Sequence, residues 1–264
     1  MYAFTYEAPT TLDAAARQAA SGARPIAGGQ SLLPALRLRL ADPGQLVDLG
    51  RIPELAGIRR QGDALAIGAM ARHQQVADSA EVRAAIPALA DLAGHIGDRQ
   101  VRARGTLGGS LANNDPAADY PAAALALGAT IVTNQREIAA ADFFVGMYTT
   151  ALNEGELIRE VRFPVPRRAA YQKFRQGASR FALVGVFVAE APDGVRVAVT
   201  GAASSVFRHA ALEAALGREF SAASAAGVRI DPTDLGSDLH ASPGYRAQLI
   251  SVLAQRAVQA LVAA

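Results

Sequence analysis

Two glycine-containing stretches in the first half of the chain have residue types that suit phosphate binding. The first, residues 25–34, runs from an apolar segment into Gly28 and Gly29 and then to Ser31, which can cap a short helix. Adjacent glycines let backbone N–H groups approach a ligand without an intervening Cβ, and a helix start favours anions. A pyrophosphate would fit here. For a bare pair of glycines, however, an ordinary strand-to-helix turn is the more frequent explanation, and the loop matches neither a GxGxxG nor a Walker motif.

The second stretch, residues 104–119, repeats this chemistry of small residues flanked by hydroxyls. Thr106 and Ser110 can donate hydrogen bonds to phosphate or flavin oxygens, and Asp119 can accept them from ribose hydroxyls. Because the stretch has neither a helical nor a strand period, we predict a long ordered loop, a feature that is often functional. Two such loops in one amino-terminal domain favour a dinucleotide clamp over two unrelated turns.

Composition excludes several classes of function. The 264 residues carry a formal net charge of only +2, which argues against non-specific nucleic-acid binding. The absence of cysteine excludes disulfides, thiolate catalysis, a cysteinyl link to a cofactor and an iron–sulfur cluster held by this chain. Any cluster that takes part must therefore belong to a partner.

No catalytic or metal-binding motif stands out. The histidines lack metal-ligand spacing, and we expect them to be at the surface or hydrogen-bonded: His73, His95, His209 and His240. Asp115 and Asp119 flank Pro116 in a loop, which does not support a paired-carboxylate catalyst. Most of the three arginines near the second loop are expected to form a solvated face: Arg99, Arg102 and Arg104.

The predicted elements of the first half are short strands and helices. They are strands at 4–6, 45–49 and 64–68, a helix at 12–20 capped by Thr10 or Thr11, and helices at 72–78 and 81–93, the last bent or divided at Pro87. An alanine-rich window at 120–133 reads as a buried helix running into a strand and is too short to span a bilayer. No secretory signal is visible at residues 1–10, so we expect a cytoplasmic protein without membrane insertion.

The second half is predicted to contain a small separate domain. A helix at 141–148 and a strand at 157–163 precede Pro164 and Pro166, which we take as the domain boundary. Beyond it come three strands at 171–176, 182–190 and 196–203 and two helices at 210–216 and 245–262. A run of strands followed by helices indicates an α+β domain.

The sequence resembles the FAD-binding medium subunits of molybdenum hydroxylases, the xanthine dehydrogenase and carbon monoxide dehydrogenase flavoprotein family. Residues 25–40 and 104–119 resemble the flavin motifs of that family, and the similarity continues through 4–9, 96–101, 155–164 and 171–181. The resemblance implies an α+β fold: residues 1–165 form a p-cresol methylhydroxylase type FAD-binding domain in two subdomains. Residues 166–264 form a small domain of a three-stranded antiparallel sheet with helices.

The resemblance also implies cofactor-binding residues. Those that would hold the FAD pyrophosphate and ribityl chain are Ala27, Gly28, Gly29, Gln30, Ser31, Leu32, Thr106, Gly109 and Ser110. Asp119 would lie near the adenosine ribose, and Ile96 and Ile158 would pack on the cofactor. Lys173 matches a lysine near the isoalloxazine, and Phe181 matches a position that is often aromatic.

Three of these positions are unusual. Ser110 stands where asparagine or aspartate is usual in the family, and Phe181 stands where tyrosine or tryptophan is common. Lys173 is the only lysine among 26 basic residues. A compact ammonium differs from the planar fork of arginine in a tight site, so we expect a specific role for this residue.

The family resemblance implies an oxidoreductase subunit that binds FAD non-covalently and has no catalytic residue or metal ligand of its own. It would pass electrons from [2Fe-2S] centres to a terminal acceptor. A molybdopterin-binding large subunit and a [2Fe-2S] small subunit would be its partners, in a dimer of heterotrimers. Two alternatives stay open: a self-contained FAD-dependent oxidase or reductase on the same fold, and an assembly module without flavin.

Overall fold

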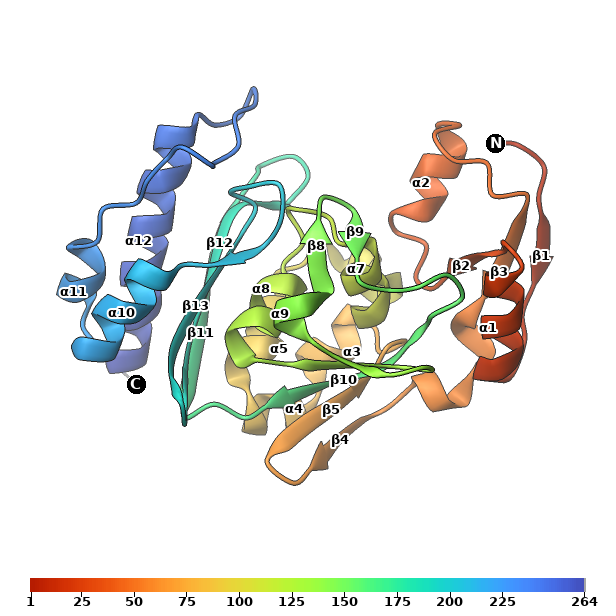
Figure 1. The fold of residues 1–264 in the computed structure, drawn as a ribbon, viewed down its shortest axis with the longest axis horizontal. Coiled ribbons are helices and arrows are strands. Elements are labelled where there is room, and N and C mark those ends of the chain that lie inside the picture. The colour runs from red at the N-terminus through yellow and green to blue at the C-terminus, as the bar shows by residue number, and fades with distance from the viewer. Residues whose placement is uncertain (264) are drawn as a thin grey trace.

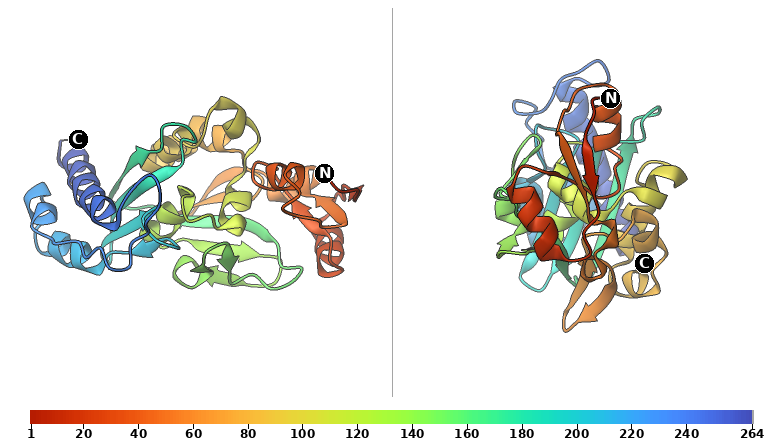
Figure 2. Two further views of the ribbon diagram at one scale, coloured as in Figure 1. Left: turned by 90° about the horizontal axis from the view of Figure 1, so that it is seen from above. Right: turned by 90° about the vertical axis from the view of Figure 1, so that its right-hand side faces the viewer.

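The computed structural model describes residues 1–263, which form three units arranged along the long axis of the molecule (Figure 1). The amino-terminal unit lies at one end, the carboxy-terminal unit lies at the other, and the largest unit lies between them. The view from above shows the same order (Figure 2). The first glycine stretch lies in the amino-terminal unit, and the second lies in the middle unit.

The first unit is a three-stranded parallel sheet of order β1-β3-β2 with two helices. Its elements are β1 (Thr5–Glu7), α1 (Leu12–Ala20), β2 (Arg24–Ile26), α2 (Leu32–Arg37) and β3 (Gln45–Asp48). Thr11 caps α1 by accepting a hydrogen bond from the Ala14 N–H, and Leu12, Ala15 and Ala19 face the core. Helix α1 has the predicted bounds. Ser31 precedes α2, but its side chain makes no capping bond, so that expectation is wrong.

The middle unit is an antiparallel five-stranded sheet of order β4-β5-β10-β6-β7, with helices and a small hairpin. Its strands are β4 (Ile58–Gln61), β5 (Ala64–Gly68), β6 (Thr130–Thr133), β7 (Glu137–Ala139), β8 (Phe144–Gly146), β9 (Thr149–Thr150) and β10 (Ile158–Pro164). Its helices are α3 (His73–Asp78), α4 (Ala80–Ala85), α5 (Pro87–Gly94), α6 (Arg99–Arg104), α7 (Leu107–Asn113), α8 (Tyr120–Leu127) and α9 (Ala140–Phe143). As predicted, Pro87 divides one helical pattern into two, because proline suits the first helical turn.

The third unit is an antiparallel sheet of order β11-β12-β13-β14 covered by helices. Its elements are β11 (Arg168–Arg175), β12 (Ala182–Ala191), β13 (Gly194–Thr200), β14 (Phe207–Arg208), α10 (Ala210–Arg218), α11 (Ala222–Ala226) and α12 (Pro243–Val262). The sequence predicted three strands, and the structure adds β14, which is too short to show a period. None of the helices within residues 1–263 is both long and apolar enough to cross a membrane.

Strand β12 shows that the third unit is not packed as an isolated domain. Val184, Val186 and Val188 face the helices α10–α12, whereas Phe187 and Ala189 belong to the hydrophobic core of the middle unit. Side chains alternate between the two faces of a strand, so this central strand is buried on both. The two cores meet across the β11–β13 sheet, although the chain passes between the units at the predicted prolines.

Two predicted segments differ in the structure. Residues 104–119 are not one loop, because they contain α7, which starts at the cap residue Thr106. Glycine weakens helices, but a Cβ on Gly108 would lie 2.6 Å from the Ala69 Cβ, so tertiary packing requires glycine here. The predicted helix at 141–148 ends at Phe143, and the chain turns into the hairpin β8–β9, where Tyr148 has a φ of 53°.

Candidate cofactor site

The two glycine stretches are in direct contact, although they are far apart in sequence. A Cβ on Gly28 would lie 2.2 Å from the Arg104 carbonyl oxygen and 2.7 Å from the Gly105 Cα. A Cβ on Gly109 would lie 3.4 Å from the Ala27 Cβ. The loop after β2 therefore rests on the segment that joins α6 to α7, and the two stretches form one site.

The first stretch presents backbone donors that the protein does not use. The N–H groups of residues 28–31 donate no hydrogen bond to any acceptor in residues 1–263. Gly29 has a φ of 73°, a left-handed conformation that suits glycine. Successive N–H groups on such turns form concave surfaces that bind anions, and neither Gly28 nor Gly29 places a Cβ in the way. These residues fit the diphosphate of a dinucleotide such as FAD.

Protein groups already bond most N–H donors between Gly105 and Gly109, and the Thr106 N–H is the exception. The Thr106 hydroxyl oxygen accepts a hydrogen bond from the Gly109 N–H at 3.2 Å, and the Leu107 N–H donates to the Ala71 carbonyl at 3.0 Å. Thr106 is buried, and the half-buried Ser110 bonds through its backbone to the Thr106 carbonyl. What this stretch can offer a cofactor is therefore its hydroxyl groups, its surface and the N–H of Thr106, for which residues 1–263 supply no acceptor.

A buried ion pair joins two residues to which the sequence assigned separate roles. Lys173 Nζ donates to Asp119 Oδ2 at 2.9 Å and to the His95 carbonyl at 3.2 Å, and the Tyr171 hydroxyl donates to the other oxygen of Asp119. The side chains of Lys173 and Asp119 are 6% and 4% exposed. Burial raises the pKa of the Asp119 carboxyl, and the Lys173 ammonium partly offsets that rise.

This pairing changes the interpretation of Asp119 and Lys173. The carboxylate that was expected to bind a ribose and the ammonium that was expected near the isoalloxazine bind each other. They also join strand β11 of the third unit to the start of α8 and the end of α5. The buried Asp119 carboxylate explains why a compact ammonium is found at position 173. Direct contacts of Asp119 or Lys173 with FAD stay predictions.

The remaining predicted contacts lie in three different environments. Ile96 is half-buried and follows His95, whose carbonyl accepts a hydrogen bond from Lys173. Ile158 is 5% exposed within the core of the middle unit, so little of its surface can meet a cofactor. Phe181 is 46% exposed at the end of the turn between β11 and β12. Their contacts with FAD also stay predictions.

Asn114 is a structural residue of the site that sequence reasoning missed. It ends α7 in the left-handed conformation with a φ of 44°, and its side-chain amide donates to the carbonyls of Gly146 and Thr149, both at 2.8 Å. The amide thus fixes the hairpin β8–β9 to the helix that carries the second stretch. The signal was present, because asparagine is common at left-handed helix ends.

His73 departs from the expectation for the histidines. It is 5% exposed, its ring lies 5.4 Å from that of Tyr120, and its Nδ1 has no hydrogen-bond partner within residues 1–263. Burial, with a smaller effect of the Arg102 charge, lowers the pKa of His73 to about 4. This imidazole is therefore neutral at pH 7 and is not the surface or hydrogen-bonded side chain that was predicted.

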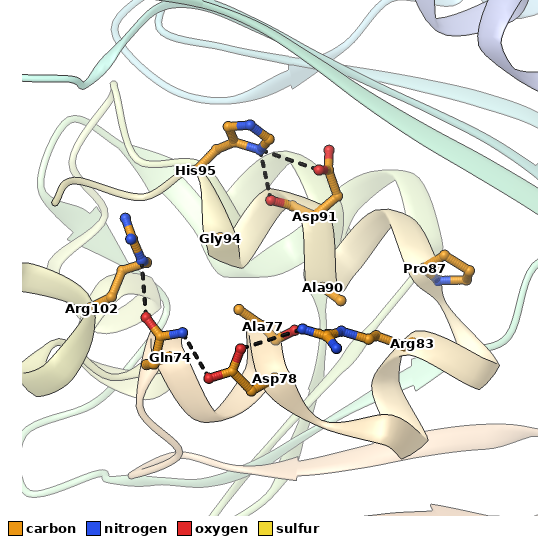
Figure 3. Close-up of a pocket in the computed structure, with 10 residues that line it drawn as sticks. All are labelled: Gln74, Ala77, Asp78, Arg83, Pro87, Ala90, Asp91, Gly94, His95 and Arg102. Carbon is orange, nitrogen blue, oxygen red and sulfur yellow. Dashed lines mark hydrogen bonds and ion pairs between the residues drawn. The ribbon is translucent and has the colours of Figure 1, made fainter. Parts of the chain in front are cut away.

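A separate hollow of about 460 Å³ lies between α3, α5 and α6 (Figure 3). Its polar side chains are largely occupied with one another: Arg102 donates to Gln74, and Arg83 donates to Asp78. Arg102 also donates to the carbonyls of Ile96 and of the next residue, at 3.1 and 3.3 Å. This wall of the hollow therefore supports the loop that carries Ile96.

Comparisons with known proteins agree with this geometry. A family model described as the FAD binding domain in molybdopterin dehydrogenase matches residues 2–166. The carbon monoxide dehydrogenase medium chain of Hydrogenophaga pseudoflava is 35% identical over an alignment of 276 positions, gaps included, that covers 97% of this chain and 96% of that one. The nicotine 6-hydroxylase medium subunit of Paenarthrobacter nicotinovorans is 37% identical, with 88% and 87% covered.

Solved structures match over nearly the whole chain. Carbon monoxide dehydrogenase from Hydrogenophaga pseudoflava superposes with a TM-score of 0.89 at 35% identity, covering 99% of this chain and 98% of that one. Quinoline 2-oxidoreductase from Pseudomonas putida 86 gives a TM-score of 0.90 at 32% identity, with 98% and 96% covered. These matches confirm the predicted fold class and the family resemblance. The chain belongs to the family of FAD-binding domains of molybdopterin dehydrogenases, and it is an oxidoreductase flavoprotein whose cofactor is FAD.

Proposed function

We propose that this chain is the electron-transfer subunit of a heteromeric molybdenum hydroxylase. It takes electrons from [2Fe-2S] centres of a small partner subunit and delivers them to a terminal acceptor, while a molybdopterin-binding large subunit oxidises the organic substrate. The observation that carries the proposal is the single cradle formed by the two glycine stretches. Bound FAD supplies the exchange between one-electron donors and a two-electron acceptor.

The chain's own residues bind and position the cofactor. The free N–H groups of residues 28–31 hold the diphosphate, and the capped start of α7 fixes the opposite wall. We expect non-covalent binding, because the chain has no cysteine and neither glycine stretch contains a histidine. Release of all flavin on denaturation, measured by mass spectrometry of the chain, tests this expectation.

The relatives support a substrate site outside this chain. Medium chains that are 33% to 37% identical to it carry names that refer to carbon monoxide, nicotine and glyceraldehyde. One type of pocket would not recognise substrates that differ so much. A similar flavin subunit can serve each of these enzymes if the substrate binds to another subunit. We place the complex in the cytoplasm as a dimer of heterotrimers, and mass measurement of the complex copurified from its native source tests that composition.

A direct test uses the partner's iron–sulfur subunit as the electron donor. That subunit is reduced with dithionite, freed of excess reductant and mixed with the FAD-loaded chain. Bleaching of the flavin absorption is the expected result. Absence of bleaching with a reduced and stably bound partner would overturn the proposed electron path. The chain stripped of FAD is the control, and its complex should fail to reduce the terminal acceptor.

The same material separates the two alternative functions. Oxidation of purines, aldehydes or N-heterocycles by the FAD-loaded chain alone, without molybdenum, would identify a self-contained flavin enzyme. A folded chain that binds no FAD would identify an assembly module. We expect neither result.

A further inference from the structure

Gly105 lies between α6 and α7. It contacts both the first glycine stretch and the His73 ring. The Cα of Gly105 lies 2.7 Å from the place where a Cβ on Gly28 would stand. A Cβ on Gly105 itself would lie 2.4 Å from His73 Nε2 and 2.7 Å from His73 Cδ2. Real Cβ atoms do not approach other atoms this closely, so the position has room only for hydrogen.

The backbone of Gly105 does not itself require glycine. Its φ of −59° and ψ of 143° are values that ordinary residues adopt. The space taken by the His73 ring is therefore the main reason for a glycine here, with a 3.1 Å approach to the Val101 carbonyl as a smaller one. In this respect Gly105 differs from Gly29, whose positive φ favours glycine whatever surrounds it.

The His73 ring cannot easily move away. His73 is the first residue of α3, and its N–H donates to the Gly105 carbonyl at 2.9 Å. The backbone and the ring of His73 therefore both contact Gly105. The ring packs against Tyr120, which is fully buried. Arg72 and Thr106 pair as an isolated bridge next to it, which fixes the two segments in register.

From these contacts we propose that His73 is a positioning residue for FAD binding, which acts through Gly105 to set the second glycine stretch at the distance from Gly28 that the cofactor requires. The His73 ring supports Gly105, Gly105 supports Gly28, and Gly28 begins the run of free N–H donors. The inference rests on the assignment of FAD to the two glycine stretches. It does not depend on the proposed electron path, because it concerns only cofactor retention.

The test is a pair of substitutions measured singly and together. Gly105→Ala should weaken FAD binding roughly tenfold or more, because the added methyl must displace the ring or the stretch. Gly105→Ala combined with His73→Ala should bind FAD better than Gly105→Ala and about as well as His73→Ala alone, because the methyl then has space although the supporting ring is gone. FAD affinity is measured by the recovery of flavin fluorescence on dissociation, and folding is checked by circular dichroism.

A matched control and a second single variant complete the test. Gly94→Ala adds a methyl whose nearest contact is an ordinary 3.9 Å, and it should bind FAD like the wild type. His73→Ala alone should raise the FAD dissociation constant severalfold while the apoprotein stays folded, which a purely structural core histidine would not do. An unchanged dissociation constant in either Gly105→Ala or His73→Ala, or a double variant no better than Gly105→Ala, would overturn the proposal. Failure of the wild type to bind FAD would instead contradict the cofactor assignment itself.

Discussion

The two glycine stretches form one site but use glycine for different reasons. In residues 28–31 the backbone N–H groups have no acceptor within residues 1–263 and can bind a ligand. In residues 105–109 every N–H group except that of Thr106 is bonded within the protein, and glycine is needed because neighbouring atoms leave no room for a side chain. The comparison shows that similar sequence chemistry can mark a binding surface in one place and close packing in another. Changes to the first stretch should act mainly on FAD, and changes around the second should act mainly on folding.

Gly28 belongs to both categories and limits the comparison. Loss of FAD in Gly28→Val would not by itself prove contact with phosphate, because the new side chain would also meet the Arg104 carbonyl. Residues whose side chains are deleted rather than enlarged separate the two roles more clearly.

The largest effect is expected at the ion pair behind the second stretch. Lys173→Met leaves the buried Asp119 carboxylate without its cation and should lower the free energy of unfolding by about 3–5 kcal/mol. Chemical denaturation of the apoprotein measures this loss. Lys173→Met combined with Asp119→Asn should recover most of it, because the neutral amide needs no cation.

A salt bridge of two exposed side chains provides the control for that prediction. Arg83 and Asp78 are both 60% exposed, so Arg83→Met should cost at most about 1 kcal/mol. Equal losses in Lys173→Met and Arg83→Met would show that the Lys173 pair does not support the second stretch. A lowered flavin potential in a stable Lys173→Met variant would favour the direct flavin contact that the sequence suggested.

Acid should act on the support of the second stretch through His73. Its pKa is about 4 in the folded chain, below the ordinary value of 6.5, so the unfolded chain binds the proton first as the pH falls. Stability should therefore fall between pH 6.5 and pH 4, by about 3 kcal/mol in total. The positive charge of Arg102 acts in the same direction, and Tyr120 packs against the ring as a neutral phenol.

The measurement is the slope of unfolding free energy against pH in wild type and His73→Leu. The variant should show the shallower slope in this window. His209, whose pKa burial also lowers, is the matched control, because its substitution removes a titrating histidine far from the glycine stretches. Parallel slopes in wild type and His73→Leu would contradict the assigned pKa.

Amide hydrogen exchange should distinguish the two stretches directly. Saturation with FAD at about 100 times its dissociation constant should slow exchange in residues 28–31 roughly 100-fold, because exchange then requires the cofactor to leave. The amides of Leu107 and Gly109 should be protected already in the apoprotein, since protein acceptors bond them. Similar responses of the two stretches to FAD would remove the difference on which the comparison rests.

The smallest effect is expected from two hydroxyl residues in equivalent positions. Thr106→Ala removes a helix cap and should cost about 1 kcal/mol of apoprotein stability. Ser31→Ala removes a hydroxyl that makes no capping bond, and it should leave apoprotein stability unchanged. If Ser31 contacts FAD, its variant should instead bind the cofactor more weakly, as titration calorimetry would show. A larger stability loss in Ser31→Ala than in Thr106→Ala would contradict the structure.

Local pattern and turn chemistry determined much of the fold. The helix Leu12–Ala20 and the strand Ala64–Gly68 have the predicted bounds, because the helix buries one regular set of side chains and the strand is a short apolar run that is buried on both faces. Pro87 at the start of α5 and Pro164 at the end of β10 mark boundaries that any tertiary structure must respect, since proline has no N–H to donate. The residue types and order of the two glycine stretches also predicted that they act together in one cofactor site, and the structure shows that the two stretches are in contact.

Only the tertiary structure decided what individual residues of the site do. The pairing of Asp119 with Lys173 and the fit of Gly105 against His73 depend on atoms that sequence distance separates and folding brings within a few ångströms. Helix α7 forms in a glycine-rich segment because packing against Ala69 outweighs the low helix propensity of glycine. The sequence by itself determined which two segments are predicted to bind the cofactor, whereas space and burial decided how those segments meet and which side chains hold them in place.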